Sequence, residues 1–492
     1  MKLRCAGQRG TSYSMRREAE LREIRFPRKT LGTRVKLRFA GGGRLAIGRP
    51  GSMLQRCGVT AMPRSPLPTI GLLSAICLGL PGTRAGAAGE LSVEDFKFDG
   101  PLGCQGAKIE KLAPNHFRIT VGHAPQHPEW PNMAQFQIVR HAQGNAPTIE
   151  VRSVGAKQYL IHHYSYSWSY DGRDWRPLRW QNTRSSDEGT FKFPVFEQDT
   201  VFVGHQVPMS YADVTALLDG WKQHPAVKVH VVGQSLGGRN LYRMEIADPR
   251  SPHPVAERWV HYFANQHPGE HNSQWRMVGA IEWLLSREGE DTRRRSICHF
   301  VLLMSPDAPT NGWYRVNAQG LDINRSYSSA GSNPDQGHEP YLWQKDLESL
   351  MASDCPVSSV WSMHTWPGVA DPNIALAPDL AVVLGPATRF AEILQRHDPD
   401  HKWVKPLKIS EGRVKARSKP WTPPPPGKKP VPHGGGAAWN SGPGNQFGVT
   451  HVLCEGGGGQ LTKAENLQSG RVLMQSLAEY FRGTKPRPRE QR

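Results

Sequence analysis

Short stretches of alternating hydrophobic and polar residues occupy the region between residues 90 and 205. This two-residue period is typical of β-strands with one buried face, and the Gly, Pro and Asn residues between the stretches favour turns. The stretches are HFRITV (116–121), FQIVRH (136–141), TIEVRSV (148–154) and FKFPVF (191–196). We therefore predict a small antiparallel β domain over residues 89–206.

The pattern changes near residue 208, where segments with a helical period begin to alternate with hydrophobic runs. Ser210 is a suitable N-cap for the first helix. This alternation predicts an α/β domain over residues 207–483, with a mixed, mostly parallel sheet flanked by helices on both faces. The predicted helices cover residues 212–221, 273–288, 342–351, 379–397 and 464–481, and the predicted strands cover residues 226–233, 258–266, 296–306, 357–364 and 449–457.

The chain length of 492 residues agrees with two folded domains, since single hydrophobic cores stop growing at roughly 250–300 residues. Residues 405–447 are basic and rich in Pro and Gly. We interpret them as a solvated insertion in the second domain rather than a lid. Residues 484–492 form a basic tail.

The N-terminal region carries most of the positive charge. Residues 1–88 contain 17 Lys and Arg against 3 Asp and Glu, which leaves only +4 of the net charge of +18 to residues 89–492. The predicted domains are therefore only mildly basic, and we expect no nucleic-acid partner.

A secretory signal explains this leader better. A hydrophobic run over residues 69–80 follows Arg64 and precedes an A-x-A site at residues 85–87. The run is shorter than the roughly 20 residues that span a bilayer. We predict a non-structural extension or mis-assigned start over residues 1–61 and a signal peptide over residues 62–88. The protein would then be periplasmic or secreted, without a transmembrane segment after signal removal; an organellar or cytoplasmic location is the alternative if the leader is no signal.

Four of the seven cysteines lie outside the leader: Cys104, Cys298, Cys355 and Cys454. Their spacing permits a disulfide but dictates none. No CxxC pair occurs in the chain, which argues against a zinc site made of cysteines.

Four ionisable residues lie at or just beyond the ends of predicted strands. His267 and Glu270 follow the strand 258–266, and two later strands end at His364 and Glu455. Ligands of open α/β sheets bind outside the carboxyl ends of the strands. Catalytic zinc takes three protein ligands and leaves a position for water, and a further carboxylate can accept a proton from that water. We predict one Zn²⁺ held by His267, Glu270 and His364, with Glu455 as the general base.

A further motif, YRVNAQGLDINR at residues 314–325, lies between these residues. The order of HPGE, R-x-N-x-x-G-x-D-x-N-R, a strand ending in His and a strand ending in Glu resembles the M14 family of zinc carboxypeptidases, in particular its cytosolic-carboxypeptidase-like branch. The resemblance covers roughly residues 90–480. It implies the zinc carboxypeptidase fold with a β domain ahead of the catalytic domain.

The resemblance also implies roles for the matching residues. Arg315 would stabilise the oxyanion of the tetrahedral intermediate. Asn324 and Arg325 would hold the free C-terminal carboxylate of a peptide or protein substrate, and a guanidinium matches a carboxylate in bidentate geometry. Asp322 would orient a neighbouring side chain or have a structural role.

The sequence departs from the family in one respect. Digestive members place a mobile Tyr between the last His and the catalytic Glu, whereas no Tyr occurs between His364 and Glu455. A residue that closes over the substrate would come from elsewhere, such as Trp421 or Trp439.

Three other functions fit parts of the sequence. GQSLG at residues 233–237 matches the G-x-S-x-G nucleophile elbow, which would make Ser235 the nucleophile of an α/β serine hydrolase. That motif needs a following helix, whereas LYRMEIADP (241–249) alternates and predicts a second strand, with a hairpin turn at Gly237 and Gly238. The other two functions are a zinc amidohydrolase that deacylates N-acyl amino acids and a non-catalytic binding module. We predict a zinc metallocarboxypeptidase whose preferred C-terminal residue and oligomeric state the sequence leaves open.

Overall fold

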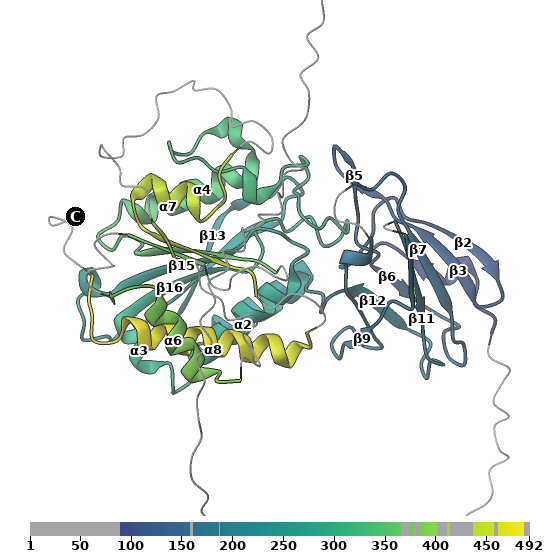
Figure 1. Ribbon diagram of the computed structural model, residues 1–492, viewed down its shortest axis with the longest axis horizontal. Coiled ribbons are helices and arrows are strands. Elements are labelled where there is room, and N and C mark those ends of the chain that lie inside the picture. Colours follow the sequence, from purple (N-terminus) through teal and green to yellow (C-terminus); the bar gives the residue numbers. More distant parts are fainter. Residues whose placement is uncertain are drawn as a thin grey trace, which may run out of the picture. The chain divides into compact units, whose positions relative to one another are not determined.

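The computed structural model of the chain describes residues 89–157, 161–185, 187–365, 373–377, 384–400, 411–413, 436–456 and 461–486. These residues belong to one compact unit, Pro81–Arg492, which combines β-sheets and α-helices (Figure 1). The predicted extension and signal peptide, residues 1–88, lie outside the described residues. Among the described residues, no helix is long and apolar enough to cross a membrane.

The first part of the described chain consists of β-sheets. One five-stranded sheet has the order β1-β6-β12-β8-β9, a second has the order β10-β11-β7-β3-β2, and β4 pairs with β5. All pairs are antiparallel except β3 with β7. The strands are β1 (Phe96–Lys97), β2 (Lys108–Ala113), β3 (His116–Thr120), β4 (His123–Ala124), β5 (His127–Pro131), β6 (Phe136–Ile138), β7 (Thr148–Arg152), β8 (Tyr166–Ser169), β9 (Arg176–Leu178), β10 (Asn182–Ser185), β11 (Glu188–Lys192) and β12 (Val201–His205).

Aromatic side chains from these two five-stranded sheets pack against one another in a shared core. The ring centroids of Phe96 and Phe117 lie 4.9 Å apart, and those of Tyr166 and Phe191 lie 5.1 Å apart. The prediction of an N-terminal antiparallel β region is therefore confirmed.

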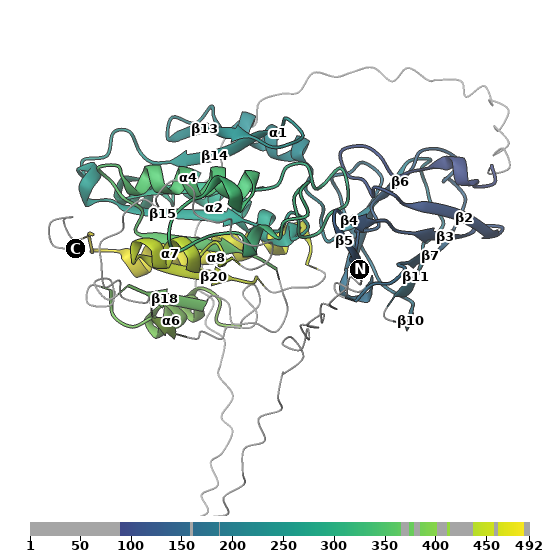
Figure 2. The ribbon, with the colours of Figure 1, turned by 90° about the horizontal axis from the view of Figure 1, so that it is seen from above.

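An eight-stranded mixed sheet follows, with the order β13-β14-β16-β15-β17-β20-β18-β19. Its central strands β16, β15, β17 and β20 are parallel, whereas the β13-β14, β14-β16 and β18-β20 pairs are antiparallel. Figure 2 shows the labelled strands in this order from β13 to β18. The strands are β13 (Val227–Gln234), β14 (Asn240–Ile246), β15 (Trp259–Asn265), β16 (Ser296–Val301), β17 (Ser359–Met363), β18 (Asn373–Leu376), β19 (Glu411–Arg413) and β20 (Thr450–Cys454).

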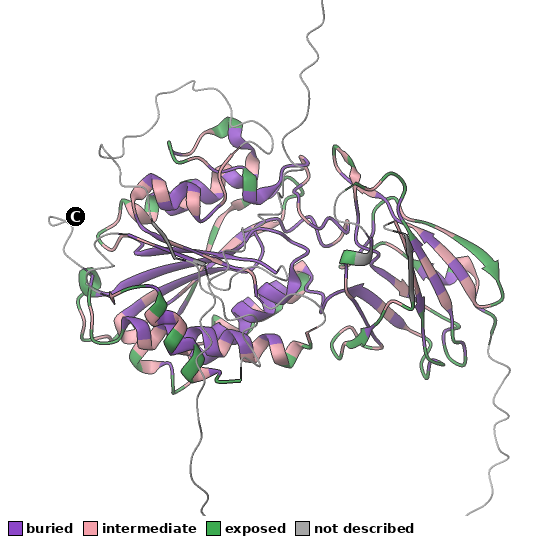
Figure 3. Cartoon of the chain, viewed as in Figure 1, coloured by how far each residue is buried: buried purple, intermediate pink, exposed green. Residues whose placement is uncertain are grey.

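Helices cover both faces of this sheet, which confirms the predicted fold class. Helices α2, α6 and α8 lie on one face and α4 and α7 on the other (Figure 1), and the strands between them are buried (Figure 3). The helices are α1 (Tyr211–Trp221), α2 (His271–Leu285), α3 (Glu290–Arg295), α4 (His338–Met351), α6 (Thr388–His397), α7 (Ser441–Phe447) and α8 (Lys463–Phe481). The 3-10 helices are η1 (Val93–Asp95), η2 (Ile161–His163), η3 (Val255–Glu257), η4 (Ile323–Arg325) and η5 (Pro334–Gln336).

The packing of α2 against α8 fixes the helix that starts beside the predicted metal ligands. A Cβ atom added to Gly279 would lie 1.9 Å from the backbone oxygen of Leu467, and one added to Gly470 would lie 1.7 Å from that of Arg276. Because no side chain fits in these spaces, the two glycines allow the helix backbones to approach closely.

Two predictions about the C-terminal half are wrong in part. The helix predicted over residues 379–397 does not run through Gly385, which has a φ of 76°, and α6 begins only at Thr388. The segment 405–447 is not wholly a solvated insertion, since its end forms helix α7 and the side chain of Trp439, also in this segment, is fully buried. Pro and Gly are frequent in loops, and here long-range packing overrides that local preference.

Candidate metal centre

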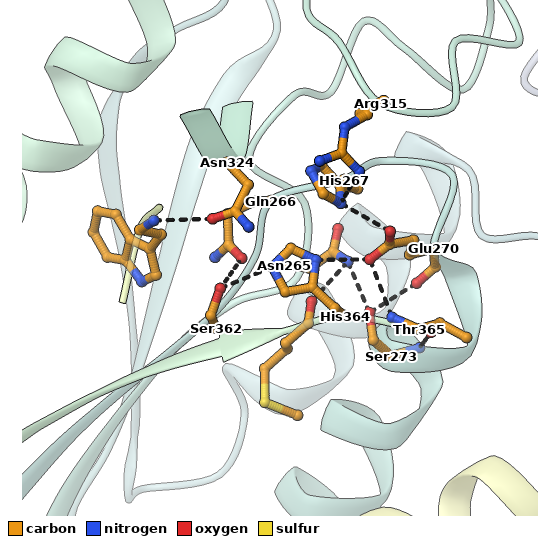
Figure 4. Close-up of polar contacts among 12 residues, drawn as sticks. Asn265, Gln266, His267, Glu270, Ser273, Arg315, Asn324, Ser362, His364 and Thr365 are labelled. Atoms are coloured by element: carbon orange, nitrogen blue, oxygen red, sulfur yellow. Dashed lines mark hydrogen bonds and ion pairs between the residues drawn. The ribbon is translucent and has the colours of Figure 1, made fainter. Parts of the chain in front are cut away.

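The HPGE turn connects β15 to α2 at the carboxyl end of the sheet. The backbone N–H of Glu270 donates to His267 O at 3.0 Å, which closes the turn, and α2 begins at the next residue. His364 directly follows β17, whose Met363 pairs in parallel register with Asn265 of β15. Neighbouring parallel strands thus bring His267, Glu270 and His364 to one edge of the sheet (Figure 4).

These three side chains are buried and converge on one point. The Nδ1 atom of His267 lies 2.8 Å from Oε1 of Glu270, and Nδ1 of His364 lies 2.8 Å from Oε2. The possible ligand atoms of the three residues all lie within 4.8 Å of one another. Two imidazoles and one carboxylate in this arrangement match a ligand set of catalytic zinc.

The hydrogen bonds of the two imidazoles indicate that a cation fits between them and Glu270. The Nε2 atom of His267 lies 3.2 Å from Oδ1 of Asp322, and Nε2 of His364 lies 2.8 Å from Oγ of Ser362, whose hydroxyl donates to Gln266 Oε1. Both Nε2 atoms are therefore assigned as donors, and a proton on each Nδ1 completes an ion pair with the carboxylate. A metal ion would replace these two protons and take the Nδ1 lone pairs together with the carboxylate, so the chemistry of this donor set fits a metal ion.

The charges of the site keep its carboxylates ionised. Burial by itself would raise the pKa of Glu270, but His267 and His364 beside it hold that pKa well below the usual value. Burial also opposes ionisation of Asp322, yet Arg315 and His267 lower its pKa. An ionised Glu270 is the form that binds a metal.

Glu455 directly follows β20, on the strand beside that of His364. Met363 and Cys454 are paired in parallel register, and the backbone N–H of His364 donates to Cys454 O at 2.7 Å. Glu455 is half-buried and level with His364 along the two strands.

Arg315 lies close to the three converging residues. Its Nε donates to Oδ2 of Asp322 at 2.6 Å, and its Nη1 lies 3.4 Å from Nδ1 of His267. The guanidinium thus reaches the edge of the candidate metal centre.

Asn324 and Arg325 lie in η4, immediately after Asp322. Asn324 is buried, and its Oδ1 accepts the backbone N–H of Trp439 at 2.9 Å. Arg325 is exposed and donates from Nη1 to the backbone oxygen of Asn324 at 2.8 Å.

Trp439, one of the two residues suggested for closing over a substrate, is a core residue. Its side chain is fully buried, and its ring centroid lies 5.3 Å from that of Tyr262 and 4.9 Å from that of Tyr327. It cannot move over the site without unpacking this core. Trp421 lies outside the described residues.

Sequence reasoning missed two side chains that contact the candidate ligands. Tyr314 donates its hydroxyl to Oε1 of Glu270 at 3.2 Å, and Ser362 contacts His364. Ser362 had a detectable signal, because residues two apart on a strand point to the same face. No sequence signal indicates the direction of the Tyr314 side chain, because that direction depends on the tertiary packing of a loop.

The G-x-S-x-G segment is a hairpin turn, as the alternation after it predicts. Strands β13 and β14 are antiparallel, and Gly238 between them has a φ of 77°. Ser235 donates from Oγ to Oδ1 of Asp307 at 2.9 Å, and the backbone N–H of Gly237 donates to Oδ2 at 2.8 Å. Ser235 therefore holds a turn together, and a serine hydrolase is not favoured.

Comparison with known proteins identifies the family of a region that contains part of this site. Residues 214–360 match the family model Peptidase_M14, described as zinc carboxypeptidase. The chain contains a zinc carboxypeptidase domain of the M14 family. The matched residues include His267, Glu270, Arg315, Asn324 and Arg325 and end four residues before His364.

Curated relatives of the chain are named cytosolic carboxypeptidases. The chain is 30% identical to cytosolic carboxypeptidase 3 of Mus musculus over 175 residues, which are 34% of this chain and 16% of the relative. It is 32% identical to cytosolic carboxypeptidase 2 of Homo sapiens over 148 residues, 28% of this chain and 16% of the relative. The matched region thus spans about a sixth of these relatives' length.

Solved structures share the fold at low sequence identity. The metallo-carboxypeptidase from Burkholderia cenocepacia superimposes with a TM-score of 0.59 at 17% identity, covering 78% of this chain and 98% of that one. The metallo-carboxypeptidase from Pseudomonas aeruginosa gives a TM-score of 0.55 at 20% identity, with 78% and 98% coverage. These two likenesses establish the fold of the M14 domain.

The predicted location is contradicted by the same comparisons. The relatives are named cytosolic carboxypeptidases, which points to the cytoplasm rather than to the periplasm or secretion. The predicted export was therefore wrong, because a short apolar run behind basic residues does not by itself specify a compartment.

Among the described residues, the four cysteines that lie outside the leader are free thiols. Cys104 and Cys298 are fully buried, and burial raises the pKa of each to about 12. Both therefore pack as uncharged, apolar side chains.

Proposed function

We propose that the chain is a zinc-dependent metallocarboxypeptidase that removes C-terminal amino acids from peptides or proteins. The observation that carries this proposal is the convergence of the two Nδ1 atoms on the carboxylate oxygens of Glu270, at 2.8 Å each. The family membership of residues 214–360 supports it.

In this proposal one Zn²⁺ is held by His267, Glu270 and His364. When bound, zinc supplies Lewis-acid activation of a water molecule and of the substrate carbonyl. Glu455 accepts the proton of the attacking water on its carboxylate and later donates it to the leaving amine. The guanidinium of Arg315 donates hydrogen bonds to the oxygen on which negative charge develops.

We further propose that Asn324 and Arg325 bind the C-terminal carboxylate of the substrate. Arg325 is exposed, so its guanidinium is accessible for bidentate binding. Asn324 is held by the backbone N–H of Trp439, which limits the positions that its side chain can adopt. A site of this kind distinguishes a free C-terminus from an amidated one.

We also propose that residues 89–206 and 207–483 are two domains. The change from the five-stranded sheets to the eight-stranded sheet between β12 and β13 supports a boundary there. Expression of each segment alone, followed by thermal unfolding, tests this division. Two segments that both remain unfolded would contradict it.

The function is tested with the purified full chain and peptides whose C-terminus is either free or amidated. Zinc-dependent release of the last residue from the free peptide only is expected, with loss of activity in a chelator and recovery on adding Zn²⁺. Activity that resists the chelator would overturn the proposal. Cleavage of N-acyl amino acids in preference to peptides would instead indicate an amidohydrolase.

A further inference from the structure

The carboxylate of Glu270 has a polar contact on each oxygen besides the imidazoles. The Tyr314 hydroxyl donates to Oε1 at 3.2 Å, and the backbone N–H of Thr365 donates to Oε2 at 3.1 Å. A carboxylate oxygen has two lone-pair directions. One direction on each oxygen is thus taken by these donors, and the other faces the Nδ1 atoms of His267 and His364.

We propose that the Tyr314 hydroxyl is a positioning group that directs Glu270 toward the metal, and that the N-terminal β region supports this hydroxyl. The inference depends on the zinc-binding part of the proposed function. It concerns the orientation of a ligand by a residue outside the ligand set.

Close packing against the HPGE turn holds Tyr314 in place. The backbone N–H of Gly269 donates to Tyr314 O at 2.8 Å. A Cβ atom added to Gly269 would lie 2.5 Å from Cδ2 of Tyr314 and 2.8 Å from Sδ of Met133. The turn and the tyrosine therefore fit together only with a glycine at this position.

The ring of Tyr314 is packed among side chains of the β region. It belongs to the same hydrophobic core as the two five-stranded sheets. Its ring centroid lies 5.3 Å from that of Tyr164 and 5.8 Å from that of His205. His205 is fully buried, and burial lowers its pKa to about 3, so the ring packs as a neutral group.

Backbone hydrogen bonds connect the loop before Tyr314 to the same β region. The N–H groups of Gly103, Gln105 and Met133 donate to the backbone oxygens of Pro309, Asn311 and Gly312, at 3.0, 2.9 and 2.8 Å. The loop therefore has little freedom, and the hydroxyl has a defined position when it meets Glu270. A donor that is positioned in advance loses little entropy on orienting the carboxylate.

Removal of the hydroxyl would leave the ring packing intact but would remove the hydrogen bond to Oε1 of Glu270. Groups that orient metal ligands typically change metal affinity by about 10- to 100-fold when they are lost. Tyr314→Phe is therefore expected to weaken zinc binding by about that factor, while the fold is retained.

The matched control is Tyr164→Phe. Tyr164 belongs to the same aromatic cluster, and its hydroxyl donates to the backbone oxygen of Pro131 at 3.1 Å. This variant also removes a buried tyrosine hydroxyl, but one that donates to a backbone oxygen rather than to a candidate metal ligand. Its zinc affinity is expected to stay within about threefold of the wild type.

The experiment titrates the zinc-free full chain with Zn²⁺ in competition with a chelating indicator, and thermal unfolding of each zinc-free protein checks the fold. Weaker binding by Tyr314→Phe alone supports the inference. Equal affinity of Tyr314→Phe and wild type, or equal losses in both variants, overturns it and leaves the proposed function intact. Failure of the wild type to bind zinc overturns both.

Discussion

The Oδ1 atom of Asp322 lies 3.2 Å from Nε2 of His267, and this contact determines which ring nitrogen faces the carboxylate of Glu270. An ionised carboxylate only accepts hydrogen bonds, so the contact with Asp322 assigns a proton to Nε2 and leaves Nδ1 as the nitrogen that a metal would bind in place of its proton. Asp322 and His267 thus form a buried pair that would orient His267 for a metal in the proposed function.

We predict that Asp322→Asn weakens zinc binding by about 10- to 100-fold, because an amide can donate its own N–H to the ring and favour the wrong tautomer. Titration of the zinc-free protein with Zn²⁺ measures this change. Asp307→Asn is the control, since Asp307 is also buried but contacts the hairpin residues Ser235, Gly237 and Arg239. Equal zinc affinities of the two variants would contradict the role of Asp322.

Arg315→Lys is predicted to lower kcat/KM by about 100-fold while zinc affinity changes little. Lysine keeps a positive charge near Asp322 but loses the planar donors that would face the reacting oxygen. Steady-state kinetics with a peptide substrate and a zinc titration separate the two effects. Arg239→Lys is the control because Arg239 also pairs with a buried aspartate, Asp307, at 2.7 Å.

Arg325→Met is predicted to raise KM by about 10- to 100-fold for peptides with a free C-terminus. This is the factor that corresponds to losing a hydrogen bond between charged groups, roughly 1.5–3 kcal/mol. An amidated peptide should respond little to the same substitution. An unchanged KM for the free peptide would mean that another residue holds the terminal carboxylate.

Glu455→Gln is predicted to lower kcat by about 100- to 10,000-fold, because an amide cannot accept the proton of the attacking water. Zinc affinity should remain within about threefold of the wild type, since Glu455 is not one of the proposed ligands. Single-turnover kinetics and a zinc titration provide the two measurements. Near-full turnover would exclude Glu455 as the general base.

Acid is predicted to destabilise the fold through His261. Burial lowers the pKa of His261 to about 3, below the value of about 6.5 for an unfolded histidine. Between these values the unfolded state binds more protons, so the free energy of unfolding falls as the pH falls below about 6.5, by up to about 1.4 kcal/mol per pH unit.

Urea unfolding at pH 7 and pH 5 tests this effect. The loss of stability between the two pH values should be smaller by about 2 kcal/mol in His261→Gln than in the wild type. His299 is a second case, because burial and Arg243 lower its pKa to about 3. A loss that is equal in wild type and His261→Gln would mean that protonation of His261 does not contribute.

Local sequence patterns predicted most of the secondary structure. Ser210 caps α1, because its side chain accepts the backbone N–H of Asp213, and the predicted strand 258–266 corresponds to β15. Capping and hydrophobic period involve residues near one another in the chain, so both are visible in the sequence. The break at Gly385 was missed although Pro386 follows it, and a Gly-Pro pair is typical of turns.

For the candidate site, the sequence predicted which residue types occur at the strand ends. The parallel register of β15, β17 and β20 depends on the strand order, which local sequence patterns do not predict. The roles of all the candidate site residues remain predictions, and the family match ends at residue 360, before His364 and Glu455.

The sequence by itself determined the α/β class, the N-terminal β region and the motifs that indicate an M14 domain, because hydrophobic period and motif spacing are properties of neighbouring residues. Only the tertiary structure decided that Trp439 is a core residue, that Ser235 donates to Asp307 and that Tyr314 reaches Glu270. Each of these depends on contacts between residues far apart in the chain. Such contacts form only when sheets and loops pack, and they leave no periodic signal in the sequence.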